Sequence, residues 1–215
     1  MVLFFFLLVA GVHGAAAAVD TTVGFTAVPL TEAQFPVQKP YDVPLEQRYE
    51  LAGGVRRMWV YCTDKPHSRT SRTKPRTEIG IKQSYTSGVW QFEGYGYVPA
   101  GTTGVSIMQV FGAPRASGHV TTLMLHVYGG RLMYYHNETL VVDDNIYDRW
   151  FKLNMIHDAD AAKLTVFIDS NTRLSVSGRG KGAVHTFKFG VYTQTNSSHR
   201  MESWWRGITV LAKSC

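Results

Sequence analysis

The sequence has few cysteines, few charged side chains and no long apolar run beyond its N-terminus. Its 215 residues include two cysteines, and charged residues make up 18%. It contains neither a Cys-x-x-Cys pair nor a cluster of cysteine and histidine, so we expect no metal site and no cofactor. The absence of a repeat of fixed period argues against a propeller. After the first 18 residues no segment is apolar enough to cross a membrane.

Aromatic residues and glycine are frequent, and apolar residues alternate along short segments that end in turn residues. From Gly54 onward this pattern predicts about ten to twelve strands and no long helix. We therefore expect an all-β fold, a jelly-roll β-sandwich of two antiparallel sheets with a concave groove, and a closed barrel is the alternative. The expected strands are Val55–Thr63, Arg76–Tyr85, Val89–Val98, Gly104–Phe111, His119–Tyr128, Arg131–His136, Arg149–His157, Lys163–Asp169, Asn171–Ser177, Lys188–Gln194 and Trp204–Lys213.

Three segments are expected along the chain. Residues 1–18 form an apolar run that ends in small residues, which is typical of a signal peptide. An uncleaved anchor is the alternative, and the shortness of the run argues against it. Residues 19–47 hold four prolines and read as an extended arm, with one helical turn at Thr31–Gln34. Residues 48–215 form the jelly-roll domain. In the pair Trp204-Trp205 we expect one core ring and one surface ring, because neighbours in a strand point to opposite faces.

Two features fit a secreted protein. Asn137-Glu-Thr and Asn196-Ser-Ser match the glycosylation acceptor pattern. In an oxidising compartment Cys62 and Cys215 are expected to form one disulfide, with two unpaired thiols as the alternative. We therefore expect entry into the secretory pathway, no membrane attachment after signal cleavage, and a monomer.

The net charge of +6 is unchanged by signal cleavage, because residues 1–18 carry no charged side chain. A basic secreted protein attracts polyanions through its long-range field. Nucleic acid is excluded by the expected compartment. An acidic polysaccharide or a small polycarboxylate is the expected partner. The loop 64–75, with Arg69, Arg72 and Lys74, is either a rim that attracts anions or an ordinary solvated loop.

Polar residues share one face in three of the expected strands. In the strand 188–194 this face carries Lys188, Tyr192 and Gln194, with a gap at Gly190, while the opposite face is apolar. An ordinary half-solvated strand is the simplest interpretation of this pattern. Two other strands repeat it, however: one with Arg76, Glu78, Gly80 and Lys82, the other with Gln109 and Phe111.

If these strands lie side by side, their polar faces form a basic groove whose glycines leave room for a ring. The guanidinium of Arg76 offers a planar fork that suits a carboxylate, and Gln109 can bind the same group. Glu78 would neutralise and orient Arg76, while Lys188 adds positive charge. We predict a site for a carboxylated ligand formed by Arg76, Glu78, Gln109, Phe111, Lys188, Tyr192 and Gln194.

The same three stretches resemble the motifs of the alginate lyase family, polysaccharide lyase family 7. They read Arg76-Thr-Glu-Ile-Gly-Ile, Gln109-Val-Phe and Phe187-Lys-Phe-Gly-Val-Tyr-Thr-Gln194. The sequence is still more similar to the plant branch of the family, the citrate-binding proteins, in the blocks 59–66, 74–79, 88–95, 146–151 and 201–203. The resemblance covers about residues 45–213 in the expected order, and it implies a jelly-roll sandwich with a concave groove.

The resemblance also implies roles for single residues. Arg76 and Gln109 would neutralise a carboxylate, Lys188 would support them, and Tyr192 would transfer the proton. Two positions depart from the lyase pattern: Gly80 stands where the family has a second arginine, and Phe111 where it has a histidine. A phenyl ring cannot take a proton, so a mechanism that needs this imidazole is closed.

Two main hypotheses about the function follow, one without catalysis and one with it. The first is a secreted binder of citrate or acidic polysaccharide, located in the apoplast or the vacuole if the plant resemblance holds. The alternative is a lyase that cleaves β-linked glucuronate or mannuronate by syn β-elimination, with Tyr192 acting first as base and then as acid. A lectin-like wall protein without a small ligand is a third interpretation.

Overall fold

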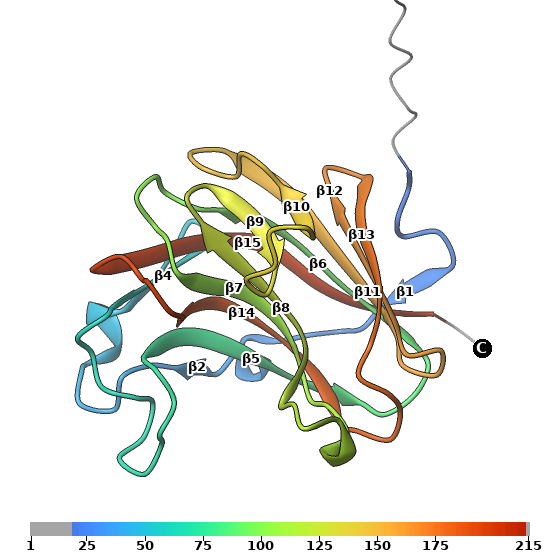
Figure 1. Ribbon diagram of the computed structural model, residues 1–215, viewed down its shortest axis with the longest axis horizontal. Helices are drawn as coiled ribbons and strands as arrows, with labels where there is room; N and C mark the ends of the chain where they lie inside the picture. Colours follow the sequence, from blue (N-terminus) through green and yellow to red (C-terminus); the bar gives the residue numbers. More distant parts are fainter. Residues whose placement is uncertain (1–18, 214–215) are drawn as a thin grey trace, which may run out of the picture.

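Two antiparallel β-sheets packed face to face make up the protein, as predicted (Figure 1). The computed structural model describes residues 19–213. The predicted signal peptide and Cys215 lie outside the described residues. Among the described residues no helix is long and apolar enough to span a membrane. The 3-10 helices are η1 (Glu32–Gln34), η2 (Leu45–Gln47) and η3 (Arg115–Ser117).

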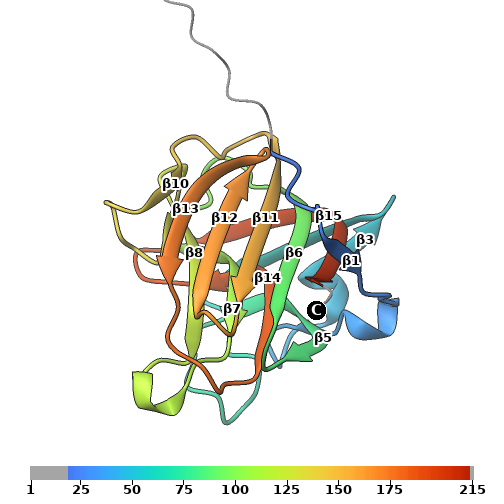
Figure 2. The ribbon, with the colours of Figure 1, turned by 90° about the vertical axis from the view of Figure 1, so that its right-hand side faces the viewer.

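One sheet is 8-stranded, with the order β13-β12-β11-β6-β15-β4-β3 and with β1 paired to β15. Figure 2 shows β13, β12, β11 and β6 of this sheet side by side. Its strands are β1 (Phe25–Ala27), β3 (Tyr49–Ala52), β4 (Val55–Tyr61), β6 (Val89–Tyr97), β11 (Trp150–Asp158), β12 (Lys163–Ile168), β13 (Asn171–Ser177) and β15 (Arg200–Lys213).

The other sheet is 7-stranded, with the order β10-β9-β8-β7-β14-β5-β2. In Figure 1 its strands β8, β7, β14 and β5 run next to one another. Its strands are β2 (Val37–Gln38), β5 (Arg76–Tyr85), β7 (Val105–Phe111), β8 (Thr121–Tyr128), β9 (Arg131–Tyr134), β10 (Val141–Asp143) and β14 (His185–Thr193).

The core between the sheets is built from the apolar face of each strand. Phe187, Phe189 and Val191 of β14 are fully buried, so the alternation in this strand is as predicted. The aromatic rings of the core contact one another, as Phe189 and Trp205 do with ring centroids 5.6 Å apart. Trp205 is buried and Trp204 is half-buried, which confirms the expected division of this pair.

The N-terminal arm is extended but is not separate from the sandwich. β1 pairs with β15 in one sheet, and β2 pairs with β5 in the other. The expected helical turn is η1, which the backbone N–H of Thr31 caps by donating to the Gln34 side chain at 2.7 Å. Since the arm belongs to both sheets, it can supply side chains to a site on either of them.

The predicted strand boundaries differ from the structure at the shorter elements. β3 and β10 are not among the expected strands, and β15 begins at Arg200 rather than at Trp204. Both glycosylation acceptors lie on exposed turns: Asn137 stands between β9 and β10, and Asn196 between β14 and β15. The use of these acceptors remains a prediction.

Cys215 lies outside the described residues, so the disulfide between Cys62 and Cys215 stays a prediction. Cys62 is exposed and has no disulfide partner among the described residues. Its backbone N–H donates to the carbonyl of His199 at 2.9 Å, which places Cys62 beside the start of β15.

Candidate functional site

Three neighbouring strands of the 7-stranded sheet carry the predicted site residues. β14 lies between β5 and β7, so the three polar stretches are side by side. Lys188 faces Gly80 on one side and Gln109 on the other, while Tyr192 is opposite Arg76. The pairing register therefore brings together side chains that stand up to about a hundred residues apart in the sequence.

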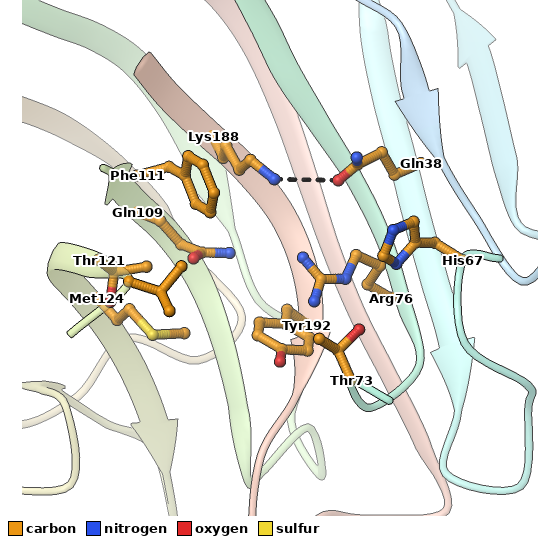
Figure 3. A pocket seen from close by; sticks show the side chains of 11 residues that line it. Gln38, His67, Thr73, Arg76, Gln109, Phe111, Thr121, Met124, Lys188 and Tyr192 are labelled. Carbon is orange, nitrogen blue, oxygen red and sulfur yellow. Dashed lines mark hydrogen bonds between the residues drawn. The ribbon is translucent and has the colours of Figure 1, made fainter. Parts of the chain in front are cut away.

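These side chains line a cavity of about 390 Å³ on the face of the sheet that points away from the core (Figure 3). Arg76, Gln109, Lys188 and Tyr192 contribute its polar wall, and Phe111 contributes a ring. The full lining comprises Gln38, His67, Thr73, Arg76, Gln109, Phe111, Val120, Thr121, Met124, Lys188 and Tyr192. Thus four of the predicted polar residues and Phe111 meet at one hollow.

Glu78 is not part of the cavity lining but lies behind it. This carboxylate is 2% exposed, and it forms an ion pair with Arg76 at 3.2 Å and a longer one with Lys188 at 3.6 Å. It also accepts a hydrogen bond from the Gln109 amide. One carboxylate therefore fixes three groups of the cavity wall, which agrees with its expected role of neutralising and orienting Arg76.

The ammonium of Lys188 is held on several sides. It donates to the Gln38 side chain at 3.0 Å (Figure 3) and stands 4.5 Å from the centre of the Phe111 ring. Burial lowers the pKa of Lys188; Glu78 opposes this shift and Arg76 adds to it. Since Lys188 is only 7% exposed and its ammonium is close to one carboxylate, an added anion would gain a strong interaction with it.

The guanidinium of Arg76 lies over the Tyr192 ring, with its central carbon 3.7 Å from the ring centre. Figure 3 shows it pointing between Gln109 and Tyr192. One nitrogen, Nη1, is paired with Glu78, while Nε has no partner among the described residues although it is buried. A buried donor without a partner is costly, so this part of the site is suited to an added oxygen acceptor.

The two glycines of the polar faces do not leave room for a ligand ring, contrary to expectation. Gly190 has a φ of +135°, and a Cβ there would lie 2.5 Å from the carbonyl oxygen of Thr77. Glycine is needed because β14 approaches the β5 backbone closely. A Cβ on Gly80 would contact the Lys188 stem at 3.5 Å. The space above Gly80 is thus filled by Lys188.

Some predicted residues stand elsewhere, and some lining residues were not predicted. The Gln194 side chain turns back to donate to the carbonyl of Tyr192 at 3.1 Å and does not line the cavity. Gln38 and His67 line it without having been singled out. Gln38 comes from the arm, and His67 follows the shared block 59–66, which is the one sequence signal that points toward it.

The loop 64–75 contributes to the cavity through uncharged side chains. His67 and Thr73 line the hollow, whereas Arg69 stacks on Tyr41 with its guanidinium carbon 5.1 Å from the ring centre. Burial lowers the pKa of His67, and the positive charges of Arg76 and Lys188 lower it further. Arg69 therefore does not line the cavity. The attraction of anions by this loop stays a prediction.

The described residues contain no group of three or more histidine, cysteine, aspartate or glutamate side chains that could hold a metal ion. The cavity instead offers two cations, two amides, a phenol and an imidazole around a partly apolar floor. This combination can neutralise a carboxylate and place a proton-transferring group beside it. Both binding and elimination next to a carboxylate are chemically open to it.

Comparisons with known proteins show the family and the fold of the chain. Over 191 residues the chain is 50% identical to a citrate-binding protein from Hevea brasiliensis, covering 88% of this chain and 78% of the relative. Among solved structures it is similar to alginate lyase AlgAT5 from polysaccharide lyase family 7. That match has a TM-score of 0.63 at 16% identity and covers 88% of this chain and 94% of the other.

Two further alginate lyases show the same fold. The family 7 enzyme A1-II' in complex with a product matches with a TM-score of 0.63 at 16% identity, covering 83% of this chain and 94% of the other. An enzyme from Pseudomonas aeruginosa matches with a TM-score of 0.63 at 15% identity, covering 84% and 99%. The alginate lyase family model matches residues 28–212. The chain therefore belongs to the alginate lyase family.

Proposed function

We propose that this protein binds a polycarboxylate in the cavity, with citrate as the first candidate and the carboxylates of an acidic polysaccharide as the second. The observation that carries the proposal is the meeting of Arg76, Gln109 and Lys188 at one hollow. The relative from Hevea brasiliensis, described as a citrate-binding protein, supports the choice of citrate.

The cavity suits a small polyanion in size and charge. A volume of about 390 Å³ falls within the usual range of small-molecule sites. Arg76 would bind one carboxylate through its free donors, and Lys188 would bind a second by exchanging its bond to Gln38. Phe111 and Met124 would contact the carbon skeleton of the ligand. Glu78 would hold the two cations in place before the ligand arrives.

Calorimetric titration with citrate tests this proposal. Wild-type protein is expected to bind citrate, and Arg76→Ala is expected to lose about 2–5 kcal/mol of binding free energy, because a buried charged partner is removed. Arg206→Ala, on the far face of the 8-stranded sheet, is the matched control and should bind as wild type does. If neither citrate nor a polyuronate binds to the wild-type protein, the proposal is wrong.

A polysaccharide lyase is the second candidate, and the position of Tyr192 favours it. Its ring lies in the same cavity as Gln109 and directly beneath the guanidinium of Arg76. In β-linked glucuronate or mannuronate, the proton on C5 and the oxygen on C4 leave from the same side of the sugar ring. One tyrosine can then serve both steps, while Arg76 and Gln109 neutralise the carboxylate.

Product formation distinguishes the two candidates. The purified protein is incubated with glucuronan, polymannuronate and polyguluronate while the absorbance of the unsaturated product is followed. A lyase of the proposed type forms product from one of the first two polymers and loses this activity in Tyr192→Phe. If all three polymers give no product and citrate binds through Arg76, the lyase is ruled out.

We also propose that the chain enters the secretory pathway, in keeping with its apolar N-terminus and with acceptors on exposed turns. Secreted protein should begin near Val19 when its N-terminus is sequenced. A glycosidase should reduce its mass, and Asn137→Gln or Asn196→Gln should each remove part of that change. A full-length N-terminus on protein recovered from cells would contradict this proposal.

A further inference from the structure

His67 is a polar residue of the cavity wall that forms no hydrogen bond to another described side chain. It belongs to the loop between β4 and β5, and its ring lines the cavity near Arg76 (Figure 3). Its Nδ1 atom is buried and forms no hydrogen bond to any described residue. Buried polar atoms in folded proteins nearly always have a partner, so an unpaired one at a cavity wall points to an added group.

The charge that the protein itself brings to the cavity is small compared with that of a polycarboxylate. Arg76 and Lys188 contribute two positive charges, and the buried Glu78 takes up one of them by pairing with both. A single net positive charge then faces a ligand such as citrate, which carries several carboxylates. Buried charges that remain uncompensated are expensive, so a tight complex needs further positive charge.

His67 is the titratable group of the cavity wall that can change its charge near neutral pH. The charged and titratable groups that face it are Arg76 and Glu78 on β5 together with Lys188 and Tyr192 on β14. Burial and the two cations lower the pKa of His67 below 6.5, against the opposing effect of Glu78, so the imidazole is mostly neutral at pH 7. An anion nearby reverses this effect and raises such a pKa by about 1–3 units.

We propose that His67 takes up one proton from solvent when a polycarboxylate enters the cavity, and that the resulting imidazolium is the third cation that holds the ligand. This inference rests on the proposed binding function and adds a proton to it. The ligand is then bound together with a proton, so its affinity rises as the pH falls. Arg76 and Lys188 would hold the ligand over the whole range from pH 6 to pH 8, and His67 would add its contribution at neutral and lower pH.

Proton uptake can be measured by titrating citrate at pH 7 in PIPES and in imidazole, two buffers with different ionisation heats. Wild type is expected to take up more protons per citrate than His67→Gln, with a difference of at most about one, because a nearby anion raises the pKa of this imidazole. Protons that citrate itself exchanges cancel in this difference. The affinity of His67→Gln should be about 10-fold lower than wild type at pH 6, which corresponds to one pKa unit, and unchanged at pH 8.

His199→Gln is the matched control, since it makes the same change at an exposed histidine next to Tyr61. It should show the proton uptake of the wild type. The ring signals of His67 in the NMR spectrum of the wild type provide a second readout that does not depend on a variant. They should move to the protonated position when citrate is added at pH 7, while those of His199 stay in place.

The outcomes separate the two proposals. If citrate binds but His67→Gln takes up as many protons as wild type, or if the His67 signals do not move, the inference about His67 is wrong and the binding function stands. If the wild-type protein binds no citrate at pH 6 or pH 8, the proposed function fails for this ligand. A variant that does not fold leaves the NMR titration of the wild type to decide.

Discussion

Cations lie over aromatic rings on both outer faces of the sandwich, but the surroundings of these cations differ between the two faces. In the cavity of the 7-stranded sheet, Arg76 lies 3.7 Å from the centre of the Tyr192 ring. On the 8-stranded sheet, Arg57 lies 4.5 Å from the Trp204 ring. The contacts are of similar type, so the ring contact alone does not mark a functional site.

The difference lies in the carboxylate and in its exposure to water. The side chains of Arg76 and Glu78 are 7% and 2% exposed, whereas those of Arg57 and Glu50 are 46% and 48% exposed. Water screens the pair on the 8-stranded sheet and leaves it little net energy. In the cavity the charges are shielded from solvent, so their balance controls both stability and binding.

The largest effect is expected when the carboxylate of each pair is neutralised. Glu78→Gln removes the buried negative charge that Arg76 and Lys188 share, and it should lower the free energy of unfolding by about 3–5 kcal/mol. Glu50→Gln makes the same change at the exposed pair and should stay within about 1 kcal/mol. Urea unfolding at pH 7 measures both. Equal losses of unfolding free energy in the two variants would show that burial does not make the carboxylate in the cavity more important for stability.

Local patterns were sufficient to predict most of the sandwich. Arg76–Tyr85 and Asn171–Ser177 begin and end where the sequence predicts, because alternation and turn residues are local signals. The grouping of Arg76, Gln109 and Lys188 followed from the assumption that three similar polar faces pair with one another, which the register bears out.

Long-range pairing explains what the sequence did not predict. Gln38 bonds Lys188 across 150 positions of the chain, and only the register of the short β2 strand brings it there. His67 stands in a loop without periodicity, so apart from the neighbouring block 59–66 no pattern points toward it.

Replacing each arginine by lysine tests the comparison through binding. Arg76→Lys keeps the charge but loses the planar fork and its second bond to a carboxylate, so citrate should bind about 10–100-fold more weakly, equivalent to about 1.5–3 kcal/mol. Arg57→Lys should leave citrate binding unchanged. Calorimetry at one pH and one salt concentration measures both. A similar loss of citrate affinity in both variants would contradict binding at the cavity alone.

Histidines extend the comparison to pH. Burial, with a smaller contribution from His136, lowers the pKa of His126 on β8 to about 4, whereas His199 is exposed at the start of β15. Because the unfolded chain binds a proton near pH 6.5 and folded His126 does not, stability falls as the pH drops from about 6.5 toward about 4.

At about pH 5 this effect amounts to about 2 kcal/mol relative to about pH 7.5. His126→Phe should therefore reduce the loss of stability between these two pH values by about 2 kcal/mol, and His199→Phe should not change it. Urea unfolding at both pH values measures the difference. An unchanged pH dependence in His126→Phe would mean that this imidazole is protonated in the folded protein.

The smallest effect is expected where a cation rests on a ring without a carboxylate. Arg206 lies 4.4 Å from the centre of the Trp150 ring and forms no ion pair with any described residue. Arg206→Ala should lower the free energy of unfolding by about 0.5–1 kcal/mol, the usual range of an exposed cation–ring contact. A double-mutant cycle with Trp150→Leu isolates the coupling. A coupling of about 2 kcal/mol or more would require a contact that is shielded from water. The two faces would then not differ in how well they shield charges from solvent.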